Sequence, residues 1–579
     1  MGWCFGRITH SLNYLKTLVN QSKSKLTFFE KILLVSASDA ACFLAIILLV
    51  STFLFVLKIP ITTYNLPISF VLSIIFNIWF SKKVKADFFI QSIAKSIMLI
   101  FFLLSIFVSS SVHDLSYDGQ AYHQEAIVLL NHGWNPFYMT LVDEATANLE
   151  RWLNHYPKGN WIIAATIYKL TNNIESGKVL SILSGFIAFA FVLLGSYKLK
   201  INFYLKLLIS ALFALNPVFL YQSLSYYIDG VLVSLLISLA FISFRIVKLR
   251  EKLLFWPFLF VSIILINIKL SAVVFFGVLA FAFFLYLWIN DQLKLSFWFA
   301  KLTIVSVLTG ILFVGFNPYV TNFAAKGHPL YPVMGEDAYN YVETNTPENY
   351  WSLKPPIRLL ASIFSESSLA RGKGKFGVLK VPITISQREL ESFRQTNIKV
   401  GGFGALFGLA FLLSVFGFIY YQFNGLYIQE KLISLSVITV IFAFAAIIPT
   451  SSVARYVPFL WWIPCVIVLL LFAKKSITMN IIASVIIITL IINNLLVGAY
   501  YYPYNLKQSV KLDKQLNELS HTIISPLHVN FGQFGSTKVK LNKYNISYNE
   551  VFTDDECKNG KTFLVSNISR ICEPIIKSP

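Results

Sequence analysis

Long apolar runs recur from one end of this chain to the other. Most are 17 to 23 residues long, which is the length that a helix needs to cross a bilayer. The pattern predicts about 13 transmembrane helices. Their expected ranges are 39–57, 64–80, 90–112, 177–195, 204–222, 229–246, 253–267, 271–289, 297–316, 402–421, 432–449, 457–473 and 477–499. The apolar stretch Trp161–Leu170 predicts a further helix, interfacial or half-inserted.

Polar stretches divide the chain around these runs. We expect an N-terminal segment at 1–38, a transmembrane domain at 39–500 with long loops at 113–176 and 317–401, and a small C-terminal domain at 501–579. The last is polar and carries short β-prone runs, Lys538–Leu541 and Thr562–Val565, which predict a small α/β module. The fold class is therefore an all-α polytopic membrane protein with an added module.

Composition agrees with this class. The 579 residues are 56% hydrophobic with 13% charged residues, which is more apolar surface than one soluble core can bury. The net charge of +20 does not indicate a nucleic-acid partner, because lysines and arginines cluster in alternate short loops beside the apolar runs. This is the positive-inside pattern. It predicts a bacterial inner-membrane protein with a cytoplasmic N-terminus and an extracytoplasmic C-terminus.

The cysteines and metal-binding side chains give less information. No pair among the five cysteines has metal-ligand spacing, and no other ligand cluster predicts a bound metal or cofactor, although a divalent metal stays an open alternative. Cys557 and Cys572 share the polar tail, where a disulfide is plausible only in an oxidising compartment. Their pairing is left open.

The densest polar cluster is His113–Glu125, directly after the third apolar run. It contains Asp114 and Asp118. A carboxylate just outside a span can stay ionised near low-dielectric surroundings, which suits a general base for a hydroxyl nucleophile. The alternative is a polar loop in which an aspartate or serine caps the next helix.

Three more charged residues stand at span edges on the same predicted side. Asp229 opens the run at 229–246 and is either a helix cap or a second acid of the same cavity. Lys269 and Arg455 defy the positive-inside rule, because both lie at outer edges. Each either binds an anionic head group or extends its charged end along the membrane surface.

Two loop segments supply weaker candidates. Lys158, in the turn from His155 to Gly159, precedes the short apolar helix and can meet a phosphate or lie at the interface as an ordinary surface lysine. His328 lies in a rigid Gly-His-Pro turn and either binds a leaving phosphate or has only a structural role. Acids and cations on one membrane face match the needs of glycosyl transfer from a lipid phosphate.

Several short motifs resemble the GT-C superfamily of integral membrane glycosyltransferases, which includes protein O-mannosyltransferases and bacterial aminoarabinose transferases. The matching residues are Asp118-Gly-x-x-Tyr122-His123, Tyr156-Pro-x-Gly159, Tyr227-x-Asp229 and Arg455-Tyr456. The resemblance implies that Asp118 is the catalytic base, that Asp114 and Asp229 assist, and that Lys158 and Arg455 contact the donor phosphate. The chain departs from the family in having its acidic loop after the third span rather than the first. It also has Asp118-Gly119 in place of an Asp-Glu pair, so the choice between Asp114 and Asp118 stays open.

The sequence thus predicts an inverting glycosyltransferase. Its partners would be membrane lipid, a polyprenyl-phosphate-linked sugar as donor, and an envelope glycan or lipid as acceptor. One alternative is an O-antigen polymerase or ligase with a lipid-pyrophosphate donor, for which arginines in the long loop would be expected; that loop has Arg358, Arg371, Arg388 and Arg394. The other is a non-enzymatic lipid or solute transporter, but transporters place polar groups at mid-membrane and show paired repeats, which are not evident here.

Overall fold

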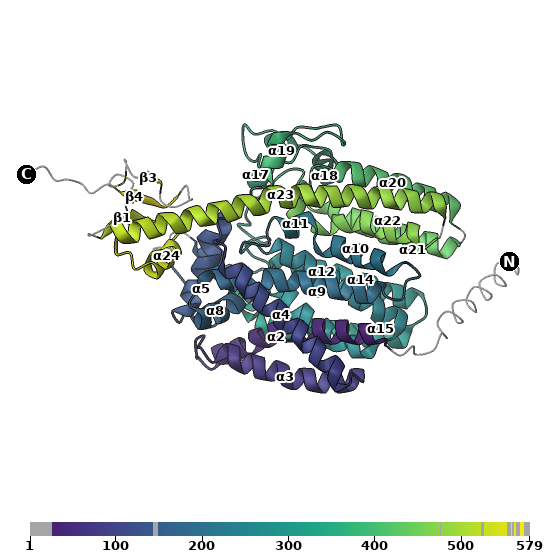
Figure 1. Ribbon diagram of the computed structural model, residues 1–579, viewed down its shortest axis with the longest axis horizontal. Helices are drawn as coiled ribbons and strands as arrows, with labels where there is room; N and C mark the ends of the chain where they lie inside the picture. Colours follow the sequence, from purple (N-terminus) through teal and green to yellow (C-terminus); the bar gives the residue numbers. More distant parts are fainter. Residues whose placement is uncertain are drawn as a thin grey trace, which may run out of the picture.

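The structure is a computed structural model that describes residues 26–142, 149–425, 427–474, 476–522, 526–552, 557, 561–562 and 568–572. Within these ranges the chain forms a bundle of apolar helices with a small sheet at one end (Figure 1). Ten helical segments are long and apolar enough to cross a membrane, and three shorter apolar helices lie among them. The predicted all-α polytopic class is confirmed.

Every predicted span overlaps one of these helical segments, although the helix in the span predicted at 204–222 already ends at Ala214. The long ones are α2 (Phe28–Val56), α3 (Asn65–Val84), α4 (Phe88–Ser110), α9 (Val179–Ser196), α12 (Asp229–Leu249), α14 (Leu270–Ile289), α15 (Leu293–Val307) continued by η4 (Leu308–Val314), α20 (Phe407–Asn424), α21 (Ile428–Ile447) and α23 (Ile477–Thr522). The short ones are α10 (Phe203–Ala214), α13 (Phe255–Ile266) after η3 (Lys252–Leu254), and α22 (Trp462–Phe472) after η8 (Pro458–Trp461).

Short helices form the connections. The first long loop holds η1 (Gly119–His123), α5 (Gln124–Asn131), α7 (Glu150–His155), α8 (Gly159–Thr171) and η2 (Ile174–Lys178). The second holds η5 (Phe316–Val320), α16 (Thr321–Lys326), α17 (Tyr341–Asn345), η6 (Glu348–Tyr350), α18 (Pro355–Ile363) and α19 (Gln387–Ser392). α11 (Pro217–Leu220) and η7 (Ala454–Tyr456) are single turns before α12 and η8. The helix expected at Trp161–Leu170 is α8, whose residues 159–167 are all buried.

The first helix begins at Phe28, not near residue 39 as predicted. Thr27 and Glu30 form a reciprocal capping box that fixes this start. The charged residues that shortened the predicted helix form ion pairs inside the fold. Glu30 bonds Arg245 at 3.1 Å and Lys198 at 3.0 Å, and Asp39 bonds Lys95 at 2.9 Å. A buried charge that has a partner does not end a helix.

The last helix also exceeds its prediction. The span expected to end at residue 499 continues as α23 to Thr522, through Pro503. Figure 1 shows α23 running along the whole bundle and reaching the sheet at its far end. The tail predicted to start at 501 therefore begins inside a helix, whose last part contributes Leu512 and Leu516 to the core of the C-terminal module.

The C-terminal module is a four-stranded sheet in the order β2-β1-β4-β3 with one helix, α24 (Thr537–Lys543). The strands are β1 (Leu527–Asn530), β2 (Tyr548–Glu550), β3 (Lys561–Thr562) and β4 (Arg570–Cys572). β1 pairs in parallel with β2 and antiparallel with β4. The β-prone run Lys538–Leu541 is in fact helical, which corrects that prediction, whereas Thr562 does lie in a strand. Residues 563–565 of the second predicted run lie outside the described residues.

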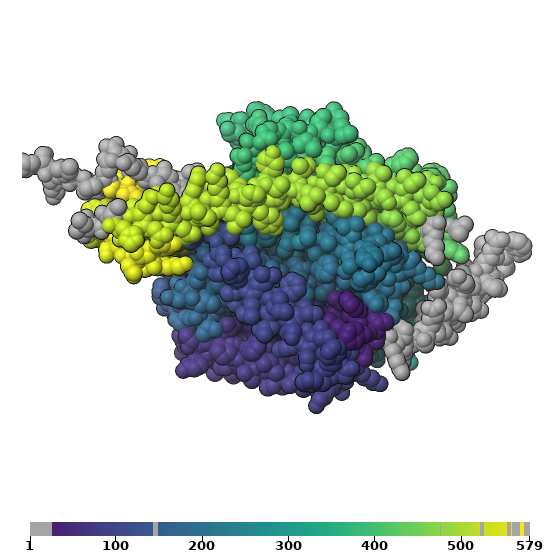
Figure 2. Space-filling view, viewed as in Figure 1, coloured from purple at the N-terminus to yellow at the C-terminus, as the bar shows by residue number. Residues whose placement is uncertain are grey.

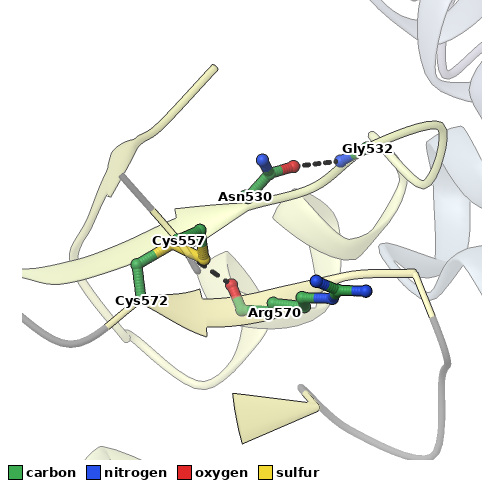
Figure 3. The surroundings of a disulfide bond; sticks show 5 residues. All are labelled: Asn530, Gly532, Cys557, Arg570 and Cys572. Carbon is green, nitrogen blue, oxygen red and sulfur yellow. Dashed lines mark hydrogen bonds between the residues drawn. A yellow bond between two sulfur atoms is a disulfide. The ribbon is translucent and has the colours of Figure 1, made fainter. Parts of the chain in front are cut away.

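A disulfide joins Cys557 to Cys572, the last residue of β4 (Figure 3). It fastens the segment before β3 to the sheet and settles the pairing that the sequence left open. The two remaining cysteines in the described chain, Cys42 and Cys465, are buried and free.

The module packs against the first long loop. Figure 2 shows the yellow C-terminal end in contact with the blue segment that contains α5 and α8. Ser536 donates to the Gln120 carbonyl at 2.7 Å, and His113 Nε2 lies 2.8 Å from Asp513 of α23. The loop that carries both candidate bases is thus held between the bundle and the module.

Candidate active site

Four charged side chains meet at the end of the bundle where the module packs. Asp229 pairs with Lys269 and lies 3.3 Å from Arg455 Nη1. The same Nη1 lies 4.0 Å from Asp118 Oδ2. We call these four residues the ion cluster. They come from the residue before η1, from α12, from the α13–α14 turn and from η7, so segments up to 337 residues apart in the chain converge on one site.

Local structure explains the position of each member. Asp229 is the first residue of α12, where the helix dipole favours a carboxylate. Gln222 fixes it further by donating to Asp229 Oδ2 at 3.1 Å while accepting from the Gly230 amide at 2.9 Å. Lys269 directly precedes α14, and Arg455 lies in η7 between α21 and η8, so both side chains stand at helix ends.

Aromatic rings surround the cations. The Arg455 guanidinium lies 4.7 Å from the Tyr456 ring centroid and 5.2 Å from that of Tyr227. Lys269 lies 4.7 Å from the Tyr456 ring. Such contacts stabilise a cation while excluding water. They keep both positive charges in a defined place beside Asp118.

The ion cluster is not saturated. The Asp118 side chain is 22% exposed, against 1% for Asp229 and 9% for Arg455. Within the described chain, no acceptor lies within hydrogen-bonding distance of Arg455 Nε, although that atom is buried. An accessible carboxylate thus lies beside a guanidinium that has an unused donor. This arrangement can receive a hydroxyl on one side and an anion on the other.

Asp114 is in a different environment. It is fully buried, and its two oxygens accept from the backbone amides of Ser116 at 2.8 Å and Tyr226 at 2.7 Å. A Cβ at Gly119 would lie 2.0 Å from Asp114 Oδ2, so a glycine is required there. Burial raises the pKa of Asp114. These contacts fasten the His113–Asp118 loop to the segment before α12.

Tyr122, His123 and Tyr156 form an aromatic layer with Trp161. His123 Nδ1 accepts the Trp161 indole N–H at 2.7 Å, and the Tyr122 ring centroid lies 4.3 Å from that of His123 and 6.2 Å from that of Tyr156. Burial lowers the pKa of His123 to about 4, so its ring is neutral at physiological pH. Because Tyr122 and His123 belong to η1, the layer ties η1 and the neighbouring Asp118 to α8.

Lys158 does not join the ion cluster. Its side chain is buried between the rings of Trp134 and Trp161, and its ammonium donates to the Asn154 carbonyl at 2.6 Å. Burial lowers its pKa well below the usual value. The next residue, Gly159, donates its amide to the Asn267 carbonyl at 2.8 Å, which ties this turn to the one that carries Lys269. No contact in the described chain supports the predicted phosphate role, which stays a prediction.

His328 is also remote from the four charges. Its Nδ1 accepts from the Leu330 amide at 3.1 Å, a contact within its own turn. The following Tyr331 packs on His155 with ring centroids 4.9 Å apart. The Gly-His-Pro segment thus supports the turn before α8, and its predicted contact with phosphate likewise stays a prediction.

The sequence interpretation missed Lys399. This lysine is 2% exposed and donates to Asn345 Oδ1. Burial lowers its pKa well below the usual value, with Arg455 lowering it further and Asp118 opposing the shift, which places its charge near the ion cluster. Lys399 precedes an apolar span on the same predicted side as Lys269, so the criterion that selected Lys269 would have found it.

Comparisons with known proteins give one structural likeness. No protein-family model matches the chain, and no curated protein does. Among solved structures, the chain is similar to the crystal structure of ArnT from Cupriavidus metallidurans bound to undecaprenyl phosphate, at 10% identity and a TM-score of 0.44. That match covers 79% of this chain and 86% of the other.

Proposed function

We propose that this protein is an inverting glycosyltransferase that moves a sugar from a polyprenyl-phosphate donor to a glycan or lipid acceptor at the outer membrane face. The observation that carries the proposal is the contact between Asp118 and Arg455 inside an ion cluster that is otherwise buried. The contact supports the proposal because the carboxylate that would act as base and the cation that would bind the phosphate lie side by side, among helices that are long and apolar enough to cross a membrane.

Asp118 would act as the general base. Its carboxylate takes the proton from an acceptor hydroxyl as that oxygen attacks the anomeric carbon of the donor sugar. The bond from this carbon to the phosphate oxygen breaks, and the phosphate keeps the electron pair. Attack from the face opposite the leaving phosphate inverts the anomeric configuration. The sugar passes through an oxocarbenium-like state that a nearby carboxylate also stabilises.

Arg455 and Lys269 would receive the leaving phosphate. As the bond breaks, negative charge grows on the phosphate, and prearranged cations stabilise that state more than the ground state. Arg455 Nε is the unused donor that a phosphate oxygen would accept from. Asp229 holds both cations in position, because it pairs with Lys269 and with Arg455. We therefore assign Asp229 a positioning role.

The choice of Asp118 over Asp114 rests on access. Both oxygens of Asp114 are used by backbone amides and the side chain is fully buried, so it has no route to a substrate hydroxyl without breaking the loop. Asp118 is partly exposed, and among the described residues no backbone amide donates to its carboxylate.

The lipid-pyrophosphate alternative receives less support from the loop arginines. Arg358 is buried, and its guanidinium donates to the backbone carbonyls of Tyr350 at 2.9 Å and Leu353 at 2.8 Å. Arg394 pairs with Glu391 at 3.3 Å on the surface. These two contacts are structural, so of the four loop arginines Arg371 and Arg388 are the exposed ones that remain available to a pyrophosphate donor.

Two experiments test the proposal. In the first, purified protein in lipid nanodiscs is given a panel of undecaprenyl-phosphate sugars with membrane-derived acceptors, and release of undecaprenyl phosphate is measured. In the second, envelope glycans are compared by mass spectrometry between strains with and without the gene. We expect donor-dependent release and the loss of one specific sugar. Unchanged glycans together with no release from any donor would refute the function.

A further inference from the structure

A second cavity lies where the C-terminal module meets the helical domain. It has a volume of about 340 Å³, within the range of small-molecule sites. On one side it is lined by α24 and the turn after it, including Lys540 and Lys543. On the other it is lined by His113, Tyr168 and residues 172–175. None of the ion cluster residues lines it, so it is a separate site.

Lys540 is the unusual residue of this cavity. Its side chain is 2% exposed, yet its ammonium makes no hydrogen bond in the described chain. The nearest carboxylate oxygen, Glu175 Oε1, is 3.9 Å away, which is an ion pair without a hydrogen bond. A buried ammonium with three unused donors is costly unless something accepts from it.

Glu175 is already engaged by other partners. Lys178 lies 2.9 Å from its Oε2, the Asp114 amide donates to the same oxygen at 3.0 Å, and His113 Nδ1 lies 3.4 Å from Oε1. The one acid in the cavity lining is therefore shared among several groups and offers little to Lys540. What remains available to a ligand is positive charge from Lys540 and Lys543.

The rest of the lining suits hydroxyl groups. Asn172, Asn542 and Asn545 are exposed amides at the cavity wall, and Tyr168 presents a half-buried aromatic ring. Amides can both donate to and accept from hydroxyls, and an aromatic ring covers an apolar face. A ligand that matches this wall has many hydroxyls, one apolar face and a negative charge.

We propose that this cavity binds an anionic sugar unit, bearing a carboxylate or a phosphate, that belongs to the acceptor glycan. The part of the proposal that concerns the acceptor rests on the proposed function. His113, in the cavity wall, precedes Asp118 by five residues, so their Cα atoms are at most roughly 18 Å apart. This separation is short enough for a glycan of several units to be held here by one unit while another meets the base.

Binding to the full chain in nanodiscs tests the cavity directly. Glucuronic acid, glucose 1-phosphate, inorganic phosphate and glucose are compared by saturation-transfer NMR for wild type and for Lys540→Gln. We expect the two charged sugars to bind and glucose not to, with binding at least tenfold weaker in Lys540→Gln. The tighter of the two charged sugars identifies the anionic group. Lys514→Gln, whose side chain is 78% exposed on α23, is the control and should bind as wild type.

Three results would overturn the cavity proposal: equal binding of glucose, equal binding by wild type and Lys540→Gln, or binding of inorganic phosphate as tight as that of the charged sugars. If Lys540→Gln does not fold, Lys543→Gln serves instead, because that side chain is exposed at the cavity wall. It too should weaken binding, and unchanged binding would count against the site.

Asp118→Asn separates this proposal from the proposed function. That variant should bind the charged sugar as wild type does, because Asp118 does not line the cavity. If wild type binds the charged sugar but transfers sugar from no donor, the proposed function is refuted and the cavity remains a sugar-binding site. Conversely, suppose that wild type transfers sugar while Lys540→Gln keeps the same KM for the acceptor. That result would refute the role of the cavity in acceptor binding.

Discussion

Two groups of buried charges lie at the same end of the bundle, and they differ in what their atoms contact. Around Glu175, the carboxylates of Asp114 and Glu175 are saturated by backbone amides, His113 and Lys178. In the ion cluster, Asp118 is partly exposed and Arg455 keeps a free donor. We propose that the first group fixes the architecture and that the second carries the chemistry. Charge alone does not separate the two groups, whereas the exposure of Asp118 and the unused donor of Arg455 do.

Replacing Asp118 by Asn tests the chemical half of this contrast. We expect the rate of sugar transfer to fall by about 100- to 10,000-fold, because the asparagine amide cannot take the proton from the acceptor hydroxyl. Release of undecaprenyl phosphate from a nanodisc sample measures this rate. The thermal unfolding midpoint should stay near that of wild type, since the side chain is partly exposed. If Asp118→Asn keeps more than a tenth of the wild-type activity, Asp118 is not the catalytic base.

Replacing Glu175 by Gln tests the architectural half. Lys178 would lose its carboxylate partner in a buried position, which costs about 3–5 kcal/mol in unfolding free energy. Thermal unfolding in detergent should show a clear drop in midpoint, while the rate per folded molecule changes little. Glu391→Gln is the matched control, because that carboxylate is 44% exposed, and it should have no effect on the midpoint. A large loss of rate with unchanged stability would reverse the assignment.

A pH scan tests whether the aromatic layer behind Asp118 depends on a neutral histidine. The folded-state pKa of His123 is about 4 and its ordinary value is 6.5, so between these values the unfolded state binds more protons. Stability is therefore complete above pH 6.5 and is lost as the pH falls toward 4, by up to roughly 3 kcal/mol.

The scan is read as the difference between wild type and His123→Gln, which removes the titrating group. Unfolding midpoints from pH 4 to 7.5 should show the smaller acid sensitivity in the variant. Parallel curves would mean that His123 does not control this pH range.

Arg455→Lys is the mildest change to the ion cluster. Lysine keeps the positive charge but not the planar fork, so one hydrogen bond to the donor phosphate is lost. We expect about a tenfold reduction in kcat/KM for the lipid donor, measured in the same release assay. Arg394→Lys, on the exposed surface, should behave as wild type. Unchanged kinetics in Arg455→Lys would indicate that the guanidinium only neutralises the charge of Asp229 and does not bind the donor phosphate.

Hydrophobic pattern predicted the helices well because the length that spans a bilayer is encoded locally. It failed at the two ends of the bundle for physical reasons. α2 contains Glu30 and Asp39, whose partners come from distant segments, and α23 continues as a polar helix past its apolar part. The run Lys538–Leu541 alternates polar and apolar residues as a strand would. It is helical in the structure, where Lys540 on α24 is buried beside Glu175.

The candidate site was predicted in part. Asp118, Asp229, Lys269 and Arg455 could be selected because each charge stands beside an apolar span on one predicted face. The roles of Asp114 and Asp118 could not be separated, since the difference lies in the Tyr226 amide, 112 residues away. Lys158 was chosen because it lies in a turn before a short apolar helix, but in the fold its ammonium donates to the backbone carbonyl of Asn154.

The unbroken course of α23 has a consequence for how the module is held. A helix of 46 residues is about 69 Å long, more than twice the thickness of the hydrocarbon core. The length of this helix sets the distance of the module from the bundle, and the helical twist sets the orientation of the module about the helix axis. One residue inserted between Tyr504 and Asp513 would turn everything beyond it by about 100°. The spacing along this helix is therefore as much a part of the anion-binding cavity as the side chains that line it.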